Sequence, residues 1–256
     1  MKNLYKDIKI LIVGEFCTDI FSYGDTFRLA PEGPAPVFNP TSSKSNGGMA
    51  LNVLANIEAI GASAFLITQN ENIIKTRYVD EHTNSLLLRV DSNDKVSKIS
   101  KEIINSIINN TYDNITYDAI IISDYCKGFL SEEDIFEISI NNSNVFLDTK
   151  KILGEWCKNV SFIKVNHFEY GRTIHTIKEI GIYDKMIITR SDEGCEYRNE
   201  IYPVEKVNIK DLSGAGDTFI SALVCEYCNS KNAIKAIKYA QKCATIVVQK
   251  KGVCTI

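Results

Sequence analysis

The sequence predicts an α/β fold in which a doubly wound, mostly parallel sheet is flanked by helices. Short apolar runs recur along the chain, and such unbroken runs are typical of parallel strands that are buried on both faces. Helical or mixed polar segments separate most of the runs, which is the alternation of strand and helix that builds a doubly wound sheet. The runs cover residues 8–13, 64–67, 119–122, 145–147, 162–165 and 186–188.

The composition is that of a globular protein with room for one large domain. The chain has 256 residues, of which 45% are hydrophobic and 24% are charged. These proportions match folded domains and exclude a disordered chain. No internal repeat, low-complexity tract or linker interrupts the sequence, so we expect a single domain over residues 1–256.

Charge and hydropathy favour a small-molecule partner and a cytoplasmic location. The formal net charge is −3, whereas nucleic acids and anionic membranes are bound by clustered Lys and Arg. No apolar run approaches the roughly 20 residues of a membrane span, and residues 1–8 are too polar for a secretory signal. Among the eight cysteines only Cys225 and Cys228 have metal-site spacing. Because a second such pair is missing, we expect core thiols rather than a metal centre.

Two segments after the first predicted strand carry distinctive backbone signals. Prolines within residues 28–37 force an extended path, so this stretch is predicted to be a rigid loop or edge segment. Further on, Gly47 and Gly48 are expected at the start of a helix that carries Asn52 on its first turns. The glycines either form a flexible cap or let the backbone approach a polyhydroxyl ligand that Asn52 binds. The segment alone does not decide between the two.

Two further elements complete the predicted architecture. Residues 75–79 and 85–90 are strand-like runs on either side of a polar turn, and we expect them to form a small hairpin or lid beside the sheet. Residues 233–248 have apolar side chains at helical spacing and should pack as a core helix.

Polar residues follow the predicted strands at the points where the strands end. In open α/β sheets ligands bind beyond the carboxyl ends of the strands. We therefore expect these side chains to converge on one site. They are Asp19, Asp124, Asp148, Asn166, Thr189 and Arg190.

A glycine-rich turn at residues 211–218 carries the strongest chemical signal. Apolar residues follow it at roughly helical spacing, so Gly214, Ala215 and Gly216 should offer backbone N–H groups to an anion at a helix N-terminus. A carboxylate among these donors, Asp217, would repel a bound phosphate but can take a proton from an attacking hydroxyl. The segment therefore predicts phosphoryl transfer with Asp217 as the base.

Several motifs occur in a fixed order along the chain. They are Val13-Gly-Glu-Phe-Cys-Thr-Asp19, the proline-rich segment 28–37, Gly47-Gly-Met-Ala-Leu-Asn52, Ser123-Asp-Tyr-Cys-Lys-Gly128, Asp148-Thr-Lys150, Asn166-His-Phe-Glu169, Thr189-Arg-Ser-Asp-Glu-Gly194 and Ser213-Gly-Ala-Gly-Asp217. Taken together they resemble the ribokinase-like (PfkB) carbohydrate kinases over nearly the whole chain. Within that family the likeness is strongest to the kinase domain of the bacterial heptose-7-phosphate kinase/ADP-heptose synthase proteins.

The resemblance implies a ribokinase-like fold, ATP and Mg²⁺ as cofactors, and a sugar or sugar phosphate as the acceptor. Asp217 would be the catalytic base, and the N–H groups of residues 214–217 would form the anion hole for the γ-phosphoryl group. The residues expected to border the nucleotide are Asn166, Glu169, Thr189, Arg190 and Gly194, with Glu169 organising Mg²⁺ through water. Those expected to bind the acceptor are Asp19, Gly47, Gly48, Asn52, Asp124 and Asp148, with Arg28, Arg77 and Lys127 as candidates for a phosphate already on the sugar.

Some features depart from the family pattern. Only residues 63–74 precede the predicted hairpin where relatives usually have a further β-α unit. A complete crossover takes ~30 residues, so that unit is expected to be missing and the lid to be reduced. Thr149 and Ser213 replace a proline and a threonine of the motifs, and both changes look tolerable. The chain stops at Ile256, so we expect a stand-alone kinase domain without the nucleotidyltransferase domain of bifunctional relatives.

The preferred acceptor is a D-glycero-heptose 7-phosphate, phosphorylated at C1. A kinase for another sugar (a hexose, pentose or nucleoside) would use the same catalytic loop. A non-catalytic sugar or nucleotide sensor is less favoured, because Asp217 and the glycine loop are intact. A dinucleotide-dependent dehydrogenase and a P-loop enzyme are excluded, because the chain lacks both glycine signatures. A monovalent cation as cofactor and a homodimer stay open.

Overall fold

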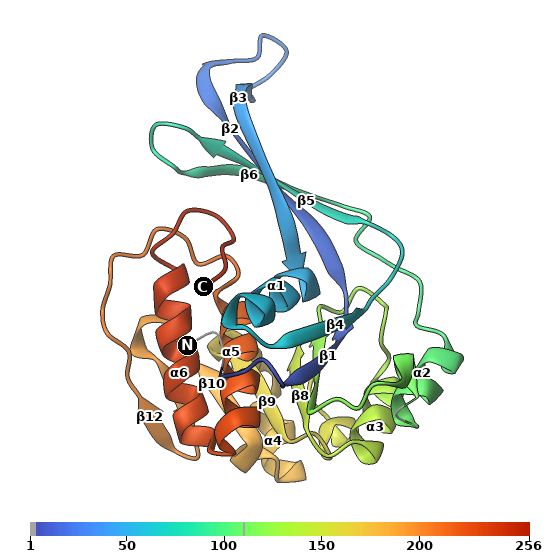
Figure 1. The fold of residues 1–256 in the computed structure, drawn as a ribbon. Helices are drawn as coiled ribbons and strands as arrows, with labels where there is room; N and C mark the ends of the chain where they lie inside the picture. Colours follow the sequence, from blue (N-terminus) through green and yellow to red (C-terminus); the bar gives the residue numbers. More distant parts are fainter. Residues whose placement is uncertain (1–3, 110) are drawn as a thin grey trace.

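The computed structural model describes residues 4–109 and 111–256, which form a body and a lid (Figure 1). The body is built on an eight-stranded sheet, and the lid is a four-stranded sheet that projects from one end of the body. The predicted α/β fold with a small β lid is therefore confirmed.

The body sheet contains every apolar run that the sequence marked as a strand. Its strands are β1 (Lys9–Gly14), β4 (Ser63–Ile67), β7 (Ala119–Asp124), β8 (Val145–Thr149), β9 (Phe162–Asn166), β10 (Met186–Thr189), β11 (Cys195–Tyr197) and β12 (Glu200–Tyr202). They lie in the order β12-β11-β10-β9-β8-β7-β1-β4, and the six strands from β10 to β4 pair in parallel. The short strands β11 and β12 add an antiparallel edge that the sequence did not predict.

Helices cover both faces of the body sheet. Helices α1 (Ala50–Ile60), α5 (Ala215–Ser230) and α6 (Ala233–Val247) pack on one face, where Ile10 and Ile12 of β1 point. Helices α2 (Lys101–Ile108), α3 (Glu132–Asn141) and α4 (His167–Ile180) pack on the other, against Leu11 and Val13. Successive side chains of a strand point to opposite faces, so each apolar strand supplies both cores. Short 3₁₀ turns lie at Tyr112–Asn114, Glu155–Cys157, Tyr183–Lys185 and Ser191–Glu193.

The lid consists of two long strands and a hairpin. Its strands are β2 (Phe16–Leu29), β3 (Pro36–Met49), β5 (Ile73–Asp80) and β6 (Leu86–Ser92), in the order β3-β2-β5-β6. The antiparallel pair β5 and β6 is the predicted hairpin. The proline-rich segment 28–37 covers the end of β2, a turn and the start of the edge strand β3. It contains no helix, as predicted, but it is extended only at its two ends.

Gly47 and Gly48 end strand β3, and the prediction that they begin a helix was wrong. They pair with Thr18 and Cys17 of β2, and α1 starts only at Ala50. A Cβ atom on Gly48 would lie 2.0 Å from a carboxylate oxygen of Asp19. The glycine is needed here because the backbone of β3 runs against a side chain of β2.

The connection between body and lid is short. Strand β4 lies at the edge of the body sheet, and the next element is the lid strand β5. No crossover helix stands between them, as the brief segment 63–74 predicted. Across residues 4–109 and 111–256, no helix combines the length and the apolar character that crossing a bilayer requires.

Candidate active site

The first turn of α5 forms the centre of the site. Gly214 precedes the helix with a φ of 79°, a left-handed conformation that glycine adopts without strain. The N–H of Ala215 donates to the carbonyl of Leu212 at 3.3 Å. The N–H groups of Gly216 and Asp217 lie in the first turn, where an α-helix provides no internal acceptor. This helix end therefore offers backbone donors and a positive dipole end to an anion.

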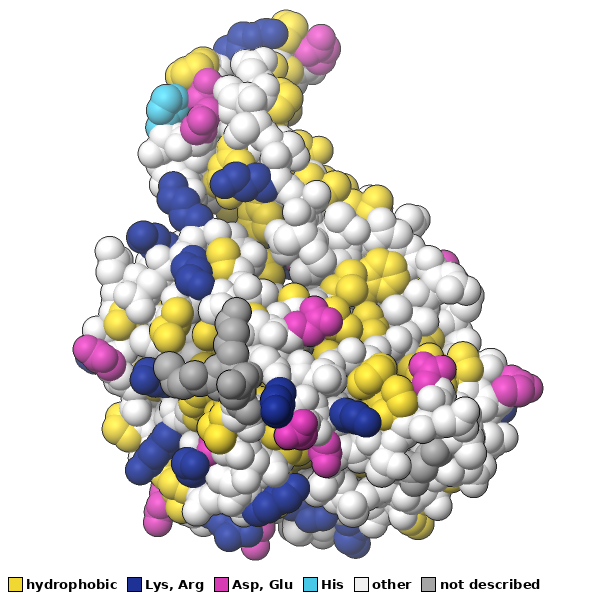
Figure 2. Space-filling model, viewed as in Figure 1, with side chains coloured by type: hydrophobic (Ala, Val, Ile, Leu, Met, Phe, Trp, Pro, Cys, Tyr) yellow, Lys and Arg dark blue, Asp and Glu magenta, His cyan; other side chains and the backbone are white. Residues whose placement is uncertain are grey.

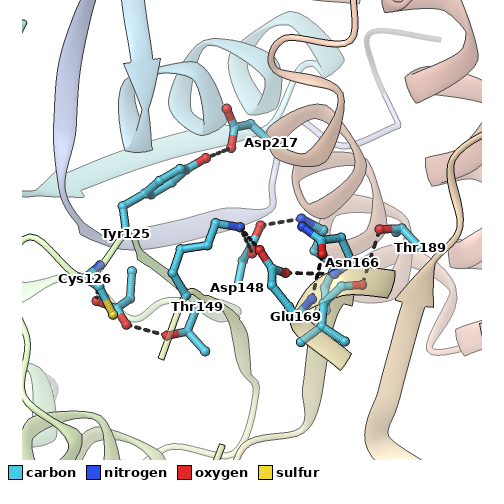
Figure 3. A network of polar contacts seen from close by, with 12 residues as sticks. Tyr125, Cys126, Asp148, Thr149, Asn166, Glu169, Thr189 and Asp217 are labelled. Carbon is cyan, nitrogen blue, oxygen red and sulfur yellow. Dashed lines mark hydrogen bonds and ion pairs between the residues drawn. The ribbon is translucent and has the colours of Figure 1, made fainter. Parts of the chain in front are cut away.

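The Asp217 carboxylate is buried and held by two side-chain donors. The residue is 6% exposed. The Tyr125 hydroxyl donates to Oδ1 at 2.7 Å (Figure 3), and Nδ2 of Asn52 donates to Oδ2 at 3.0 Å. Burial raises the pKa of the Asp217 carboxyl above its ordinary value, and the two hydrogen bonds oppose that rise because they stabilise the ionised form. The result is a poorly hydrated carboxylate in a fixed orientation, which suits proton abstraction.

Tyr125 is held in place by its own surroundings. The ammonium groups of Lys75 and Lys150 each lie 5.3 Å from its ring centroid. Burial, together with the nearby carboxylate of Asp217, raises the pKa of the Tyr125 hydroxyl well above 10. The hydroxyl therefore keeps its proton and remains a donor to Asp217.

Asn52 is oriented by a chain of side-chain hydrogen bonds between α1 and α5. Its Oδ1 accepts a hydrogen bond from Nδ2 of Asn56 at 3.1 Å, which leaves its own Nδ2 to donate to Asp217. The hydroxyl of Thr218 donates in turn to Oδ1 of Asn56 at 3.1 Å. Because the amides of Asn52 and Asn56 are both buried, this orientation is well defined.

Glu15 fixes the loop that carries Tyr125. Its fully buried carboxylate accepts the backbone N–H groups of Tyr125, Lys127 and Phe129 at 2.7, 2.9 and 3.3 Å. Burial, followed by the nearby Asp124 carboxylate, raises the pKa of Glu15, while the three N–H donors lower it. One side chain at the end of β1 thus positions the hydroxyl that contacts Asp217.

Two lysines and two carboxylates form a charge cluster beside α5. Nζ of Lys164 donates to Oδ2 of Asp148 at 2.8 Å, and Lys150 pairs with Glu169 and, at 3.7 Å, with Asp148. Burial disfavours the ionised form of Asp148, but the ammonium groups of Lys164 and Lys150 outweigh it and hold the pKa of that carboxyl below its ordinary value. Glu169 and Asn166 form a reciprocal cap at the start of α4, at 2.8 and 2.9 Å (Figure 3).

A two-part cavity lies in front of the first turn of α5. The polar part has a volume of about 730 Å³ and is lined by Tyr125, Lys150, Lys164 and residues 214–217, among others. The adjoining part, of about 300 Å³, is mostly apolar and lies between α5, α6 and residues 204–212. The two parts share Thr189 and the first turn of α5, so one elongated ligand with an anionic end and an apolar end fits both.

The structure brings most of the predicted nucleotide residues to this cavity. Asn166, Thr189 and Arg190 line the polar part, and Gly194 lines the apolar part. Gly194 has a φ of 99°, and a Cβ there would lie 2.1 Å from the carbonyl oxygen of Tyr202. Glu169 is paired with Lys150, which lines the polar part. The carboxyl ends of β9 and β10 therefore converge as the sequence predicted.

The lid and the loop before α5 line a further cavity together. Asp19 of β2 forms an ion pair with Arg77 of β5. A third cavity, of about 190 Å³, lies between the lid and the body and is lined by Arg77, Lys210 and Lys251, among others. Figure 2 shows Lys and Arg side chains gathered around this junction. The cavity therefore suits an anionic group.

Some predicted acceptor residues lie away from these three cavities. Arg28 is exposed near the far end of β2, and Lys127 pairs with Asp94 at 2.5 Å. Asp124 is fully buried, accepts from Thr149 and pairs with Lys151 at 2.7 Å. The structure therefore does not bring Arg28, Lys127 or Asp124 to the site.

The sequence prediction missed four side chains of the site: Glu15, Tyr125, Lys150 and Lys164. A signal existed for Lys164, because a lysine stands inside the apolar run 162–165 and buried lysines are rare unless they are paired. Tyr125 and Lys150 stood within quoted motifs, but nothing in the sequence showed that they face Asp217.

Known proteins match the chain in sequence. The model of the pfkB family carbohydrate kinases matches residues 111–256. The chain is 25% identical over 298 residues to the bifunctional protein HldE of Vibrio vulnificus (strain YJ016), an alignment that covers 98% of this chain and 62% of HldE. HldE of Helicobacter acinonychis (strain Sheeba) is 27% identical over 293 residues, with coverage of 95% and 63%. The chain thus spans less than two thirds of the length of these relatives.

Solved structures match the fold. The ribokinase of Thermotoga maritima superposes with a TM-score of 0.69 and 16% identity, covering 96% of this chain and 94% of that one. Arabidopsis thaliana ribokinase complexed with ribose and ATP gives a TM-score of 0.65 at 13% identity, with the same coverage. These likenesses show that the fold is ribokinase-like.

Replacing Glu15 with Ala is expected to destabilise the protein by at least about 1–3 kcal/mol, the cost of leaving one buried donor unsatisfied. Glu15→Gln keeps an acceptor oxygen at the same place and should lower the free energy of unfolding by less. Urea denaturation gives the free energies of unfolding, and hydrogen exchange reports the amides of Tyr125, Lys127 and Phe129. If both variants match the parent in stability and in exchange at these amides, Glu15 does not hold this loop.

Proposed function

The chain belongs to the pfkB family of carbohydrate kinases, and we propose that it transfers the γ-phosphoryl group of ATP to a sugar phosphate, preferably to C1 of a D-glycero-heptose 7-phosphate. The observation that supports this reaction most directly is the buried carboxylate of Asp217. It lies in the first turn of α5, between two donors, and lines the polar cavity. A base and an anion-binding helix end are thus combined within one turn.

The two-part cavity is suited to ATP. The apolar part would take the base, because cavities with a mostly apolar lining hold aromatic ligands with few polar contacts. The polar part would take the phosphates, with Asn166, Thr189 and Arg190 at its border. ATP bound to the ribokinase of Arabidopsis thaliana supports this choice of donor.

The residues around the polar part suit Mg²⁺ that arrives with the nucleotide. Mg²⁺ usually binds through one or two carboxylates, several waters and substrate phosphates. Within the described residues no group of three or more His, Cys, Asp or Glu could hold a metal, but Oδ1 of Asp148 is buried there without a hydrogen-bond partner. Asp148 and Glu169 would therefore hold the ion through water. When bound, Mg²⁺ neutralises part of the phosphate charge.

Asp217 would act as the general base. It takes the proton of the acceptor hydroxyl as that oxygen bonds to the γ-phosphorus, and the bond from phosphorus to the bridging oxygen breaks to leave ADP. The N–H groups of Gly216 and Asp217 stabilise the charge on the transferring group. Tyr125 and Asn52 hold the carboxylate throughout, so the base does not need to reorient.

The cavity between lid and body supports a phosphorylated acceptor. Arg77, Lys210 and Lys251 line it with only one carboxylate, that of Asp211. Cations at this place favour a phosphate dianion. Asp19, which pairs with Arg77 and touches Gly48, would bind sugar hydroxyls between this cavity and Asp217. The similarity to HldE favours a heptose 7-phosphate over other sugar phosphates.

Asp217→Asn is expected to lower turnover by ~10²–10⁴, the usual cost of losing a general base, because an amide cannot take the proton. ATP affinity should change little, since the side chain keeps its size. ADP release is measured with Mg²⁺-ATP across a panel of free and phosphorylated sugars, including heptose 7-phosphate. Unchanged turnover on the preferred acceptor would remove Asp217 from the mechanism.

Tyr125→Phe is expected to move the acidic limb of the pH–rate profile to higher pH. The base must be ionised, so activity falls as the pH drops through the pKa of Asp217. Loss of the Tyr125 hydroxyl removes a hydrogen bond that lowers this pKa. The pH dependence of kcat/KM is the measurement, with Tyr117→Phe in the opposite core layer as the control. If the acidic limb of the profile stays in place in the Tyr125→Phe variant, the hydroxyl of Tyr125 does not contact the base that titrates there.

Lys251→Ala is expected to raise KM for the sugar phosphate about tenfold, equivalent to about 1.4 kcal/mol, and to leave KM for the corresponding free sugar nearly unchanged. Arg28→Ala, which also removes a cation but outside the cavity, should alter neither value. Steady-state kinetics on the two acceptors provide the comparison. If Lys251→Ala raises KM for the sugar phosphate and for the free sugar by the same factor, this cavity is not the phosphate site.

A further inference from the structure

The ammonium group of Lys164 lies against the first turn of α5. A Cβ atom placed on Gly216 would be 2.8 Å from Nζ of Lys164. Lys164 is 4% exposed and lines the polar part of the cavity together with residues 214–217. A buried lysine therefore reaches the same backbone that offers N–H donors to the transferring phosphoryl group.

Strand geometry explains how a lysine of β9 reaches α5. Side chains alternate along a strand, so Phe162 and Lys164 point to the face of the sheet that α5 covers. Phe162 joins the core layer that contains α1, α5 and α6, whereas Ile163 and Val165 join the opposite layer. Lys164 thus replaces the apolar side chain that would continue the first layer, just where β9 meets the start of α5.

The ammonium of Lys164 has donors to spare. A lysine carries three N–H donors, and in the described part of the chain Lys164 gives one of them to Asp148 at 2.8 Å. Lys150, by contrast, is shared between the carboxylates of Asp148 and Glu169. Asp148 therefore fixes Lys164 without using all of its donors, and the Lys164 side chain lines the polar part of the cavity.

We propose that Lys164 is a catalytic residue: it donates to the γ-phosphoryl group and stabilises the charge on that group during transfer, while Asp148 positions it. This role rests on the kinase reaction proposed above. Lys164 stays protonated throughout and forms no covalent bond. A fixed cation in a water-poor site costs no reorganisation as charge shifts during the reaction, which is why such groups accelerate phosphoryl transfer.

A purely structural role for Lys164 makes a different prediction. If Lys164 served only to neutralise the buried Asp148, removing both charges together would restore function, because no unpaired charge would remain. If Lys164 contacts the γ-phosphoryl group, the deficit persists when Asp148 is neutralised. ADP lacks that group, so a contact with it is also visible as a difference between ATP and ADP affinity.

The test uses three variants of the full chain. Lys164→Met removes the cation, and the double variant Asp148→Asn with Lys164→Met also removes the carboxylate left behind. Lys151→Met is the matched control, because Lys151 is likewise paired with a fully buried carboxylate, that of Asp124. Thermal denaturation checks folding, and calorimetry measures the affinities for Mg²⁺-ATP and Mg²⁺-ADP without any acceptor. Turnover is measured on the best acceptor found.

We expect Lys164→Met to bind ATP about 10–100-fold more weakly, as for a lost charged hydrogen bond, and to bind ADP within about twofold of the parent. The double variant also loses a carboxylate proposed to hold Mg²⁺, so both of its affinities can fall, but its ratio of ATP to ADP affinity should be reduced as in Lys164→Met. Turnover should fall by ~10²–10³. Lys151→Met should keep the parental ratio of ATP to ADP affinity. Equal changes for ATP and ADP, or a ratio restored in the double variant, would overturn the proposal. The nucleotide affinities show whether Lys164 contacts the γ-phosphoryl group even if no sugar tested is phosphorylated. Failure of the proposed acceptor is therefore distinguished from failure of the role proposed for Lys164.

Discussion

The site depends on keeping one buried carboxylate, that of Asp217, ionised and aimed into a cavity. A buried carboxylate is costly unless hydrogen bonds satisfy it. Here the donors come from distant parts of the chain: Asn52 from α1 and Tyr125 from the loop after β7, which Glu15 holds in place. The same requirement therefore constrains both the packing of α1 against α5 and the conformation of that loop. A shift in either would leave the Asp217 carboxylate without one of its hydrogen-bond donors.

Asp217 also divides the site into two sides with different origins. In the proposed reaction the body would supply the nucleotide side through the ends of β9 and β10, the start of α5 and the cluster of Lys150, Lys164, Asp148 and Glu169. The lid would supply the acceptor side through the ion-paired Asp19 and Arg77. Because β4 leads directly into β5, the lid is tied to the edge of the body sheet by a short connection. If these roles hold, acceptor choice can vary with the lid while the proposed phosphoryl-transfer residues of the body stay the same.

Much of this fold could be predicted because its strands are buried on both faces and read as unbroken apolar runs. The glycine-rich turn at residues 211–218 could be predicted as well, since a glycine turn directly before an apolar helix is typical of an anion-binding helix N-terminus. Strands β2 and β3 could not be predicted, because β3 is exposed along most of its length and the buried positions of β2 include the polar residues Asp19 and Ser22, so neither strand reads as an apolar run. Gly47 and Gly48 were therefore assigned to a helix. Arg28 and Lys127 illustrate another limit: a sequence motif does not reveal where a long cationic side chain points. Tyr125 and Lys164 both contact the first turn of α5, which is distant from them in sequence. Such contacts depend on tertiary packing.

The most direct test of the central claim is ³¹P NMR of the reaction products. The protein is incubated with Mg²⁺-ATP and a D-glycero-heptose 7-phosphate, and the phosphorus signals are followed with time. The account predicts equal formation of ADP and of a heptose bisphosphate whose new phosphate couples to the anomeric proton. If ATP stays intact with this acceptor, or the new phosphate appears on another carbon, the proposed acceptor and position are contradicted.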